Sequence, residues 1–237
     1  MDSAELKMIG CLRVGRTLDN KGFGLFVTAN IPANTVISCE EATMYASREL
    51  RSPDIQVRIN TFCDLYSASS QADRCRLNDH ACNLEHFTAS KEYYENFENW
   101  YVNYLTRQGT YDPDIPREEK VLKLIKSWST FWTNCASSND GETGLWSTFA
   151  RANHSCRPNT LWRYVGKSPY IAQIVTMQDL PAGTEVTVSY SDLKNADLEK
   201  RRRTLQGWGF LCKCERCTED ELAQLNKPDP HRRPKTA

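Results

Sequence analysis

Hydrophobic residues along the chain form a pattern of two β-rich ends around a helical middle. Residues 22–27 (GFGLFV) and 31–37 (IPANTVI) are short apolar runs that meet at a proline-containing turn, which predicts strand, turn and strand. The same order returns later in the chain. Residues 170–176 alternate with a period of two, residues 180–184 (LPAGT) predict a turn, and residues 185–190 (EVTVSY) predict another strand.

From about residue 45 to residue 145 the apolar positions follow a helical period. One helix face is formed by Val121, Leu124, Ile125, Trp128 and Trp132. A second, aromatic stripe is formed by Tyr93, Phe97, Trp100, Tyr101 and Tyr104. Such stripes are typical of core packing, so we expect these residues to bury one face of each helix. The run 137–141 (SSNDG) predicts the end of the helical region.

The C-terminal part begins with a short basic helix. Residues 196–206 have helical character, and Gly207 is the expected stop. Beyond Glu221 the chain becomes polar and proline-rich, which predicts a mobile tail. The basic stretches 200–203 (KRRR) and 232–235 (RRPK) are too short to assign nuclear import or nucleic-acid binding.

Length, composition and charge limit the possible number of domains and the possible binding partners. The 237 residues suit one large domain or a domain with an insertion, and 40% hydrophobic residues allow a sizeable core. The chain has 30 basic and 30 acidic residues, so no overall field attracts it to nucleic acid or to an anionic membrane. We therefore expect neither partner. Acidic clusters near Glu95 and Asp114 are typical of solvated helix faces, although they also suit a basic peptide.

Ten cysteines are many for a chain of this length. The first ten residues lack the apolar segment of a signal peptide, and no run of about 18 apolar residues predicts a membrane span. A reducing compartment, the nucleus and/or the cytoplasm, is therefore expected, where clustered cysteines indicate metal ligands or reactive thiols.

Three of the cysteines lie within six residues. Cys212, Cys214 and Cys217 are too close in sequence for ordinary disulfide pairing among themselves, whereas zinc accepts four thiolates in a tetrahedron. Cys156, in the segment 153–159 (NHSCRPN), is the natural fourth ligand. The six other cysteines have no paired spacing, and we interpret them as buried free thiols.

Taken together, these segments resemble the SET domain, the fold of most protein lysine methyltransferases. The resemblance has four parts in chain order: a glycine-rich loop at 22–26, the Asn-His signature at 153–159, a strand at 185–190 that ends in the catalytic tyrosine, and a zinc-binding post-SET segment at 208–217. It spans about residues 10 to 218. The resemblance implies that four cysteines of this chain form one structural zinc site: Cys156, Cys212, Cys214 and Cys217.

The resemblance implies an α+β fold that is mainly β. Small curved sheets surround a knot-like crossing of the Asn-His segment and the tyrosine strand, with a helical insertion and a zinc-binding post-SET segment. The implied divisions are N-terminal strands at 1–44, the insertion at 45–145, the C-terminal SET core at 146–206, the post-SET segment at 207–218 and a flexible tail at 219–237.

The subtype most resembles SMYD-like SET proteins, particularly fungal ones. These have a helical insertion in the same place, and near its end an asparagine reaches the cofactor, which matches residues 133–135 (TNC). SMYD proteins proper carry a MYND zinc finger of closely spaced cysteine pairs. The candidates here are too few and too widely spaced for one: Cys63, Cys75, Cys82 and His86.

The resemblance also implies roles for individual residues. Tyr190 is the expected catalytic residue: it would orient the amine, favour the polarised methyl group and in this way also contact the cofactor. Asn153 and His154 would bind the amino-acid and adenine portions of S-adenosylmethionine. Phe210 would cover the adenine, with simple packing as the alternative. Asn134 would also reach the cofactor, with a helix C-cap as the alternative.

Further cofactor contacts are expected from the first glycine-rich loop, where Lys21, Gly22, Phe23 and Gly24 would line the methionine end. Glycines allow a backbone to approach a ligand closely. Trp162 lies nine residues after Asn153, where many SET domains place an aromatic residue. With Tyr190 it would line the lysine channel and influence how many methyl groups fit.

The leading hypothesis is an S-adenosylmethionine-dependent protein lysine N-methyltransferase that acts on a histone lysine, for example one in a histone tail. The alternatives are methylation of a non-histone protein and a catalytically silent SET module that binds peptides as an adaptor. A zinc-dependent nucleic-acid binder is disfavoured, because Cys-x-Cys-x2-Cys is not a nucleic-acid finger spacing. The sequence leaves the acceptor lysine, the degree of methylation and the oligomeric state open.

Overall fold

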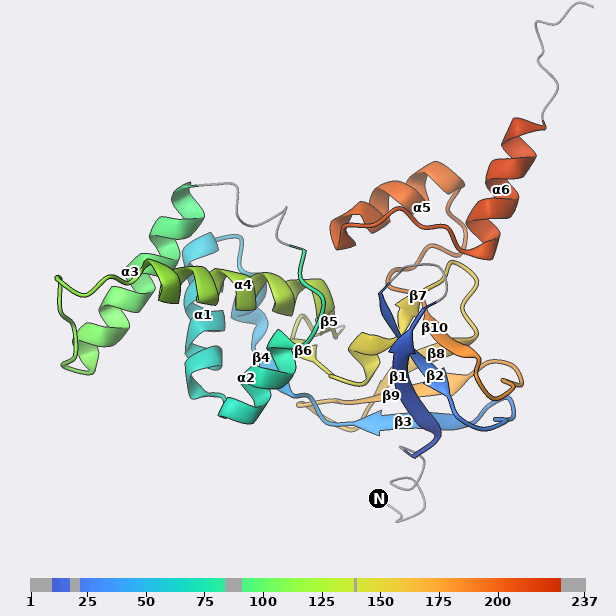
Figure 1. The fold of residues 1–237 in the computed structure, drawn as a ribbon, viewed down its shortest axis with the longest axis horizontal. Helices are drawn as coiled ribbons and strands as arrows, with labels where there is room; N and C mark the ends of the chain where they lie inside the picture. Colours follow the sequence, from blue (N-terminus) through green and yellow to red (C-terminus); the bar gives the residue numbers. More distant parts are fainter. Residues whose placement is uncertain (1–9, 18–21, 84–90, 139, 227–237) are drawn as a thin grey trace, which may run out of the picture.

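Three small sheets, a bundle of helices and a C-terminal pair of helices make up the fold of the computed structural model (Figure 1). It describes residues 10–17, 22–83, 91–138 and 140–226. The helical bundle lies to one side of the sheets, and the C-terminal helices lie over the other end of the molecule. This arrangement confirms the α+β SET fold that the sequence predicted.

The first sheet carries the residues of greatest interest. Its strands, in spatial order, are β1 (Leu12–Arg16), β2 (Phe23–Val27), β10 (Glu185–Val188) and β7 (Asn153–His154). β10 runs antiparallel to β2, with Val186 opposite Leu25, and parallel to β7, with Val188 opposite His154. Three segments that are far apart in sequence therefore meet along β10.

The other two sheets support the first and join it to the insertion. One has the order β3 (Val36–Glu40), β9 (Ile171–Thr176) and β8 (Thr160–Val165). The other has the order β4 (Met44–Ala46), β6 (Thr143–Leu145) and β5 (Ala136–Ser137). The sequence predicted both β9 and β10, and residues of both strands pack in a common core. β10 alternates between buried and half-buried positions, whereas β9 is buried at five consecutive positions, so both of its faces are covered.

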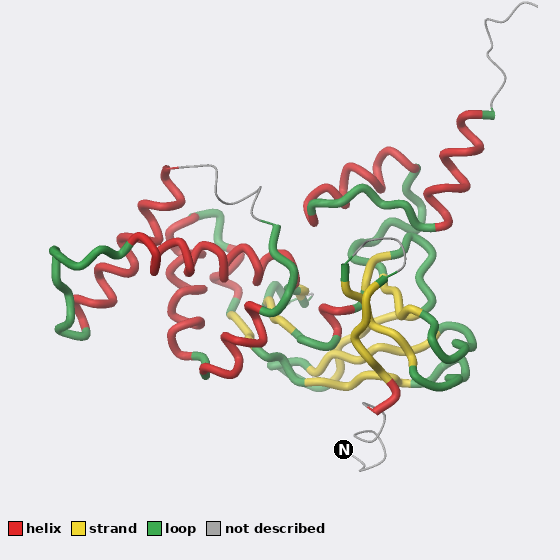
Figure 2. Tube along the Cα trace, in the orientation of Figure 1, coloured by secondary structure: helices red, strands yellow, loops and turns green. Residues whose placement is uncertain are grey.

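The insertion is a compact helical unit (Figure 2). Its helices are α1 (Ile55–Ala68), α2 (Gln71–Asn78), α3 (Lys91–Arg107) and α4 (Glu118–Asn134), and a short 3-10 turn at Arg48–Arg51 precedes them. Trp128 on α4 and Phe97 on α3 are fully buried in one core, which confirms the two predicted stripes. The range 45–145 is not wholly helical, since β4, β5 and β6 close its two ends.

Two details of the C-terminal part differ from the sequence prediction. α5 (Leu198–Leu205) begins at the cap Asp197, but Gly207 does not end it: a 3-10 turn (Gln206–Trp208) follows, and the left-handed residue is Gly209, with φ of 79°. α6 (Glu215–Leu225) continues past residue 218, so the mobile tail predicted from residue 219 is wrong as far as Leu225. The expected tail beyond residue 226 lies outside the described residues.

None of the helices in the described ranges is both long enough and apolar enough to cross a membrane.

Candidate functional site

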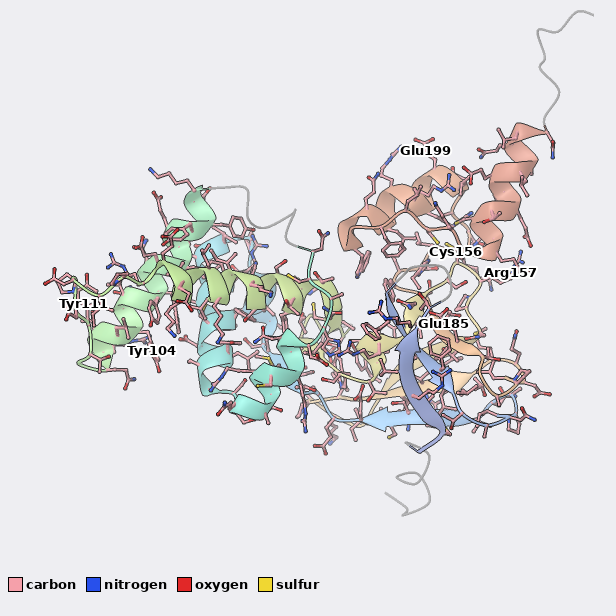
Figure 3. All side chains as sticks on the ribbon, in the orientation of Figure 1. Tyr104, Tyr111, Cys156, Arg157, Glu185 and Glu199 are labelled. Atoms are coloured by element: carbon pink, nitrogen blue, oxygen red, sulfur yellow. The ribbon has the colours of Figure 1, made fainter. Side chains whose placement is uncertain are left out.

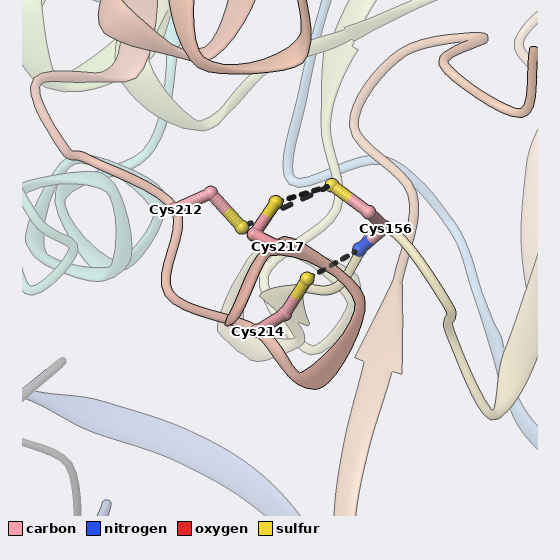
Figure 4. Close-up of side chains that lie close together, drawn as sticks. All are labelled: Cys156, Cys212, Cys214 and Cys217. Atoms are coloured by element: carbon pink, nitrogen blue, oxygen red, sulfur yellow. Dashed lines mark hydrogen bonds between the residues drawn. The ribbon is translucent and has the colours of Figure 1, made fainter. Parts of the chain in front are cut away.

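Four cysteine side chains from two distant segments meet beneath the C-terminal helices (Figure 4). All four are buried, and their sulfur atoms lie within 4.8 Å of one another. The sulfur of Cys156 is 3.9 Å from that of Cys212 and 3.6 Å from that of Cys217. Four thiolates bound to zinc at about 2.3 Å would place their sulfurs about 3.8 Å apart. The geometry therefore fits a structural zinc ion.

Local structure places three of these thiols. Cys212 precedes α6, Cys214 is the N-cap residue of α6, and Cys217 lies in its first turn. The N-terminus of a helix carries a partial positive charge, which favours thiolates at this end. Cys156 follows directly after β7 and joins them from the sheet.

Hydrogen bonds also favour thiolates at this cluster. The backbone N–H of Cys156 donates to the sulfur of Cys214 at 3.4 Å. The hydrogen bond with the Cys156 thiol lowers the pKa of Cys214, whereas the bond with Cys212 raises the pKa of Cys156. A bound metal ion would replace the thiol protons of the cluster, because zinc binds cysteine as the thiolate.

Cys63, Cys75 and Cys82, which the sequence analysis considered for a MYND finger and rejected, lie in different parts of the insertion. Within the described ranges, no second group of thiol, imidazole or carboxylate side chains is close enough to hold a metal. Cys63 is buried in α1, Cys75 is exposed on α2 and Cys82 is half-buried in a loop. His86 lies outside the described residues.

Beside the thiols, the imidazole of His154 joins the cysteine cluster to Tyr190. His154 is buried, and its Nδ1 accepts a hydrogen bond from the backbone N–H of Tyr190 at 3.1 Å. In a neutral imidazole the proton is then on Nε2, which lies 3.2 Å from the sulfur of Cys156 and donates to it. One ring therefore contacts both the backbone of the tyrosine strand and a predicted zinc ligand.

Asn153 is held in one orientation by two acceptors. Its Nδ2 donates to Oε1 of Glu185 at 2.7 Å and to the carbonyl oxygen of Phe23 at 3.2 Å. Because both neighbours only accept hydrogen bonds, the amide cannot be flipped, and Oδ1 is left to accept from a ligand. The sequence analysis missed Glu185. An acidic residue in an otherwise apolar strand, five residues before Tyr190, was the available signal.

The glycine-rich loop closes this side of the site. Gly22 has φ of 90°, a left-handed conformation, and an added Cβ would meet nothing within 4 Å, so the backbone there is open. At Gly24 an added Cβ would lie 2.7 Å from Oε1 of Glu185 and 2.9 Å from Nδ2 of Asn153. Gly24 is therefore needed for close approach, which is a reason for glycine at this position. Phe23 is 53% exposed, and Lys21 lies outside the described residues.

Two aromatic rings from the segment between α5 and α6 pack against the other side of the site. The ring centroid of Phe210 lies 6.2 Å from that of His154 and 6.3 Å from that of Tyr190. Trp208 lies 5.5 Å from Tyr190. These rings share a core cluster with the four cysteines, so the order of the aromatic segment depends on the thiol site.

The hydroxyl of Tyr190 lies at the centre of this arrangement. It donates to the carbonyl oxygen of Ala152 at 3.0 Å. Burial, and after it the carboxylate of Glu185, raise the pKa of Tyr190, so the phenol stays protonated at neutral pH. It is a hydrogen-bonding group in this state, not a base.

The two remaining predicted residues have partners of their own. The indole N–H of Trp162 on β8 donates to the carbonyl oxygen of Ser189 at 3.2 Å, next to Tyr190. The Nδ2 of Asn134 donates to the carbonyl oxygens of Ala81 and Thr130, both at 2.7 Å. These two bonds join the last residue of α4 to the preceding turn of α4 and to the loop after α2. A cofactor role for Asn134 remains a prediction.

Comparison with known proteins gives one family. The family model described as SET domain matches residues 22–191. Histone-lysine N-methyltransferase set5 of Schizosaccharomyces pombe is 28% identical over 93 residues, covering 38% of this chain and 28% of that protein. A SET and MYND domain-containing protein of Dictyostelium discoideum is 24% identical over 179 residues, covering 71% and 34%. The chain thus spans about a third or less of the length of these relatives.

Two further matches cover more of the chain. A SET domain-containing protein, L678, of Acanthamoeba polyphaga mimivirus is 24% identical over 223 residues, covering 84% of this chain and 75% of that protein. Among solved structures, the SET domain of LSMT bound to lysine and AdoHcy aligns with a TM-score of 0.50 at 12% identity, covering 88% of this chain and 56% of that one. At this identity the structural match supports the fold alone.

Proposed function

The chain belongs to the SET-domain family, since the family model covers residues 22–191, and we propose that it is an S-adenosylmethionine-dependent protein lysine N-methyltransferase acting on a histone lysine. The observation that carries this proposal is the meeting of Asn153, His154 and Tyr190 along β10, between the glycine-rich loop and the Phe210 ring. These residues come from four segments that are far apart in the sequence, and they lie together beside β10.

The cofactor would lie between these segments. Oδ1 of Asn153 would accept from the ammonium group of the methionine portion, because both N–H groups of that amide are already used. The open backbone at Gly22 would line the same end, and the Phe210 ring would cover the adenine. When bound, S-adenosylmethionine supplies a methyl group on a positively charged sulfur, ready for displacement by an amine. Lys21 and Asn134 are the weaker members of the proposed set.

Tyr190 would align the amine that receives the methyl group. Its hydroxyl and the carbonyl of Ala152 lie 3.0 Å apart and form a polar pair. They offer oxygen lone pairs to a lysine N–H and to the polarised methyl hydrogens. Alignment of this kind is the main requirement of a displacement at carbon. The amine attacks in its neutral form, and the protonated phenol of Tyr190 is not the group that accepts its proton.

Trp162 would form part of the wall of the lysine channel. Its indole is fixed by the bond to the carbonyl of Ser189 and by a ring contact with Phe149 at 5.0 Å. A ring held in this way cannot easily move aside to admit extra methyl groups. We therefore propose Trp162 as a residue that limits the degree of methylation.

Exchange of Gly24 for alanine tests the glycine-rich loop. We expect Gly24→Ala to weaken S-adenosylmethionine binding by about tenfold, which is about 1.4 kcal/mol. The new Cβ would displace the side chains of Glu185 and Asn153 and so misalign the Asn153 amide. Calorimetric titration with the cofactor measures the effect. Gly10→Ala is the matched control, because a Cβ at Gly10 meets nothing within 4 Å. Equal affinity in both variants would remove Gly24 from the cofactor site.

A histone substrate is supported by the relatives named histone-lysine N-methyltransferase. A histone tail is rich in lysine, which suits the acidic residues on the insertion, such as Glu95 on α3. We propose residence in the nucleus and/or the cytoplasm, and the relatives named histone-lysine N-methyltransferase support the nucleus. We propose no direct contact with nucleic acid, because the chain carries zero net charge.

The deciding experiment is transfer of labelled methyl groups from S-adenosylmethionine to purified core histones and, separately, to a whole-cell lysate. We expect label on one histone band. Label confined to a non-histone band would contradict the histone substrate while it preserved the methyltransferase. Absence of label in both pools, with cofactor binding intact by calorimetry, would contradict the proposed methyltransferase activity. It would favour a catalytically silent adaptor.

A further inference from the structure

The basic stretch at residues 200–203 contains a buried charge. Arg201 on α5 is 0% exposed, although its neighbours in sequence are arginines and a lysine. Burial of a guanidinium is strongly unfavourable unless negative groups surround it. The groups around the Arg201 guanidinium therefore indicate its role.

The Arg201 guanidinium donates to three acceptors, and one of them is a sulfur of the thiol cluster. Nη1 donates to the carbonyl oxygen of Ala196 at 2.8 Å. Nη2 donates to Oδ2 of Asp220 at 2.6 Å and to the sulfur of Cys217 at 3.5 Å. The guanidinium thus joins α5 to α6 and contacts one of the four predicted zinc ligands.

The other arginines of this helix have different partners. Arg202 forms a two-point pair with Glu221, with distances of 3.3 and 2.8 Å. Arg203 is exposed and pairs with Glu199 one turn earlier on the same helix. The basic stretch is therefore divided: Arg201 faces the sulfurs, whereas Arg202 and Arg203 form ion pairs closer to the surface.

The charge of the four-cysteine site indicates a role for Arg201. One zinc ion with four thiolates carries two excess negative charges in a buried place. Neutral groups already donate to these sulfurs, namely the backbone N–H of Cys156 and the imidazole of His154. Arg201 adds a full positive charge to these donors. Asp220, which is half-exposed, neutralises only part of that charge.

We propose that Arg201 is the counter-cation of the four-cysteine zinc centre, and that Asp220 is the residue that positions it. The guanidinium offsets one of the two excess charges and retains the metal. This role concerns metal retention and does not depend on methyl transfer. It is therefore tested independently of the proposed enzymatic function.

The test compares Arg201→Met, which keeps the length of the side chain without its charge, with Arg203→Met as the matched control on the same helix. Zinc content of the purified proteins and the rate of zinc release to a chromogenic chelator are measured. Outer partners of metal ligands typically contribute about 10- to 100-fold in metal affinity. We therefore expect Arg201→Met to release zinc at least about tenfold faster than wild type. Arg203→Met should match wild type. Equal release from the two variants would overturn the proposal.

A spectroscopic measurement separates charge from packing. In cobalt-substituted protein, loss of a cation beside a thiolate makes the sulfur more electron-rich. The sulfur-to-cobalt charge-transfer band of Arg201→Met should then move to longer wavelength, with no shift in Arg203→Met. A band at the wild-type position in Arg201→Met would mean that Arg201 only fills space.

Two milder variants keep the test decisive if Arg201→Met fails to fold. Arg201→Lys retains the charge, and Arg201→Gln retains donors without the charge. We expect zinc release from the lysine variant to be close to that of wild type and release from the glutamine variant to be faster. Equal rates in these two variants would exclude a role for the charge. Asp220→Asn should speed release less than Arg201→Gln does, because it misplaces the guanidinium without removing it.

Discussion

Replacement of Tyr190 by phenylalanine is expected to lower kcat for methyl transfer by about 10²- to 10³-fold, the usual loss when one positioned hydrogen-bonding group is removed from a transition state. The phenylalanine ring can keep the contacts with Trp208 and Phe210, so the fold is retained. What disappears is the hydroxyl beside the carbonyl of Ala152. Single-turnover methyl transfer with saturating cofactor measures this loss directly.

Tyr111→Phe is a suitable control for this prediction, because Tyr111 lies at the far end of the insertion, away from Glu185 and Cys156 (Figure 3). It should leave kcat unchanged. Binding of S-adenosylmethionine should also be nearly unchanged in Tyr190→Phe, since the Asn153 amide and the backbone N–H of Tyr190 remain in place. A kcat equal to that of wild type would contradict the catalytic role of Tyr190.

The second large effect is expected from the metal site. Cys156→Ser, or removal of zinc by a chelator, should abolish tight cofactor binding and lower the melting temperature. Structural zinc sites supply apparent binding free energies of about 10–16 kcal/mol in small metal-folded peptides, and loss of one ligand removes part of it. Phe210 and Trp208 share a core cluster with the four cysteines, so they would lose their support together.

Cys156 has a second link to the site, through Nε2 of His154. Loss of its sulfur therefore also loosens the ring that holds the backbone N–H of Tyr190. Zinc content and calorimetric cofactor titration, measured on the same sample, check this prediction. Cys75→Ser is the matched control, because that thiol is exposed on α2. Wild-type cofactor affinity in a zinc-free Cys156→Ser protein would separate the metal from the cofactor site.

Much of the secondary structure was predictable because periodicity is a local property. The stripe that includes Val121 and Trp128 predicted α4, and the alternation at residues 170–176 predicted β9. The end of α5 was misplaced because Gly207 and Gly209 are both candidates in sequence, and the backbone adopts a left-handed conformation at Gly209. α6 was not predicted, because its polar sequence resembles a tail. In the structure Cys217 is buried in its first turn, and Arg202 pairs with Glu221 further along the helix.

The candidate site was predictable where neighbouring residues carry the chemistry. Cys212, Cys214 and Cys217 follow one another closely, and their spacing indicates a metal before any fold is known. The partners of Asn153 could not be predicted in this way. Glu185 and the carbonyl of Phe23 reach it only because β10 pairs with both β2 and β7.

The sequence alone determined most of the helices and strands, the cluster of candidate cysteine ligands and the SET-domain family, because each depends on the order and spacing of residues along the chain. Only the tertiary structure decided which long-range neighbours meet. It gave Glu185 its place beside Asn153, and His154 its place between Cys156 and Tyr190. It also divided the basic stretch, burying Arg201 at a thiol while Arg203 stays exposed. The physical reason is that the environment of a side chain depends on the packing of segments far apart in the chain, which local patterns do not contain.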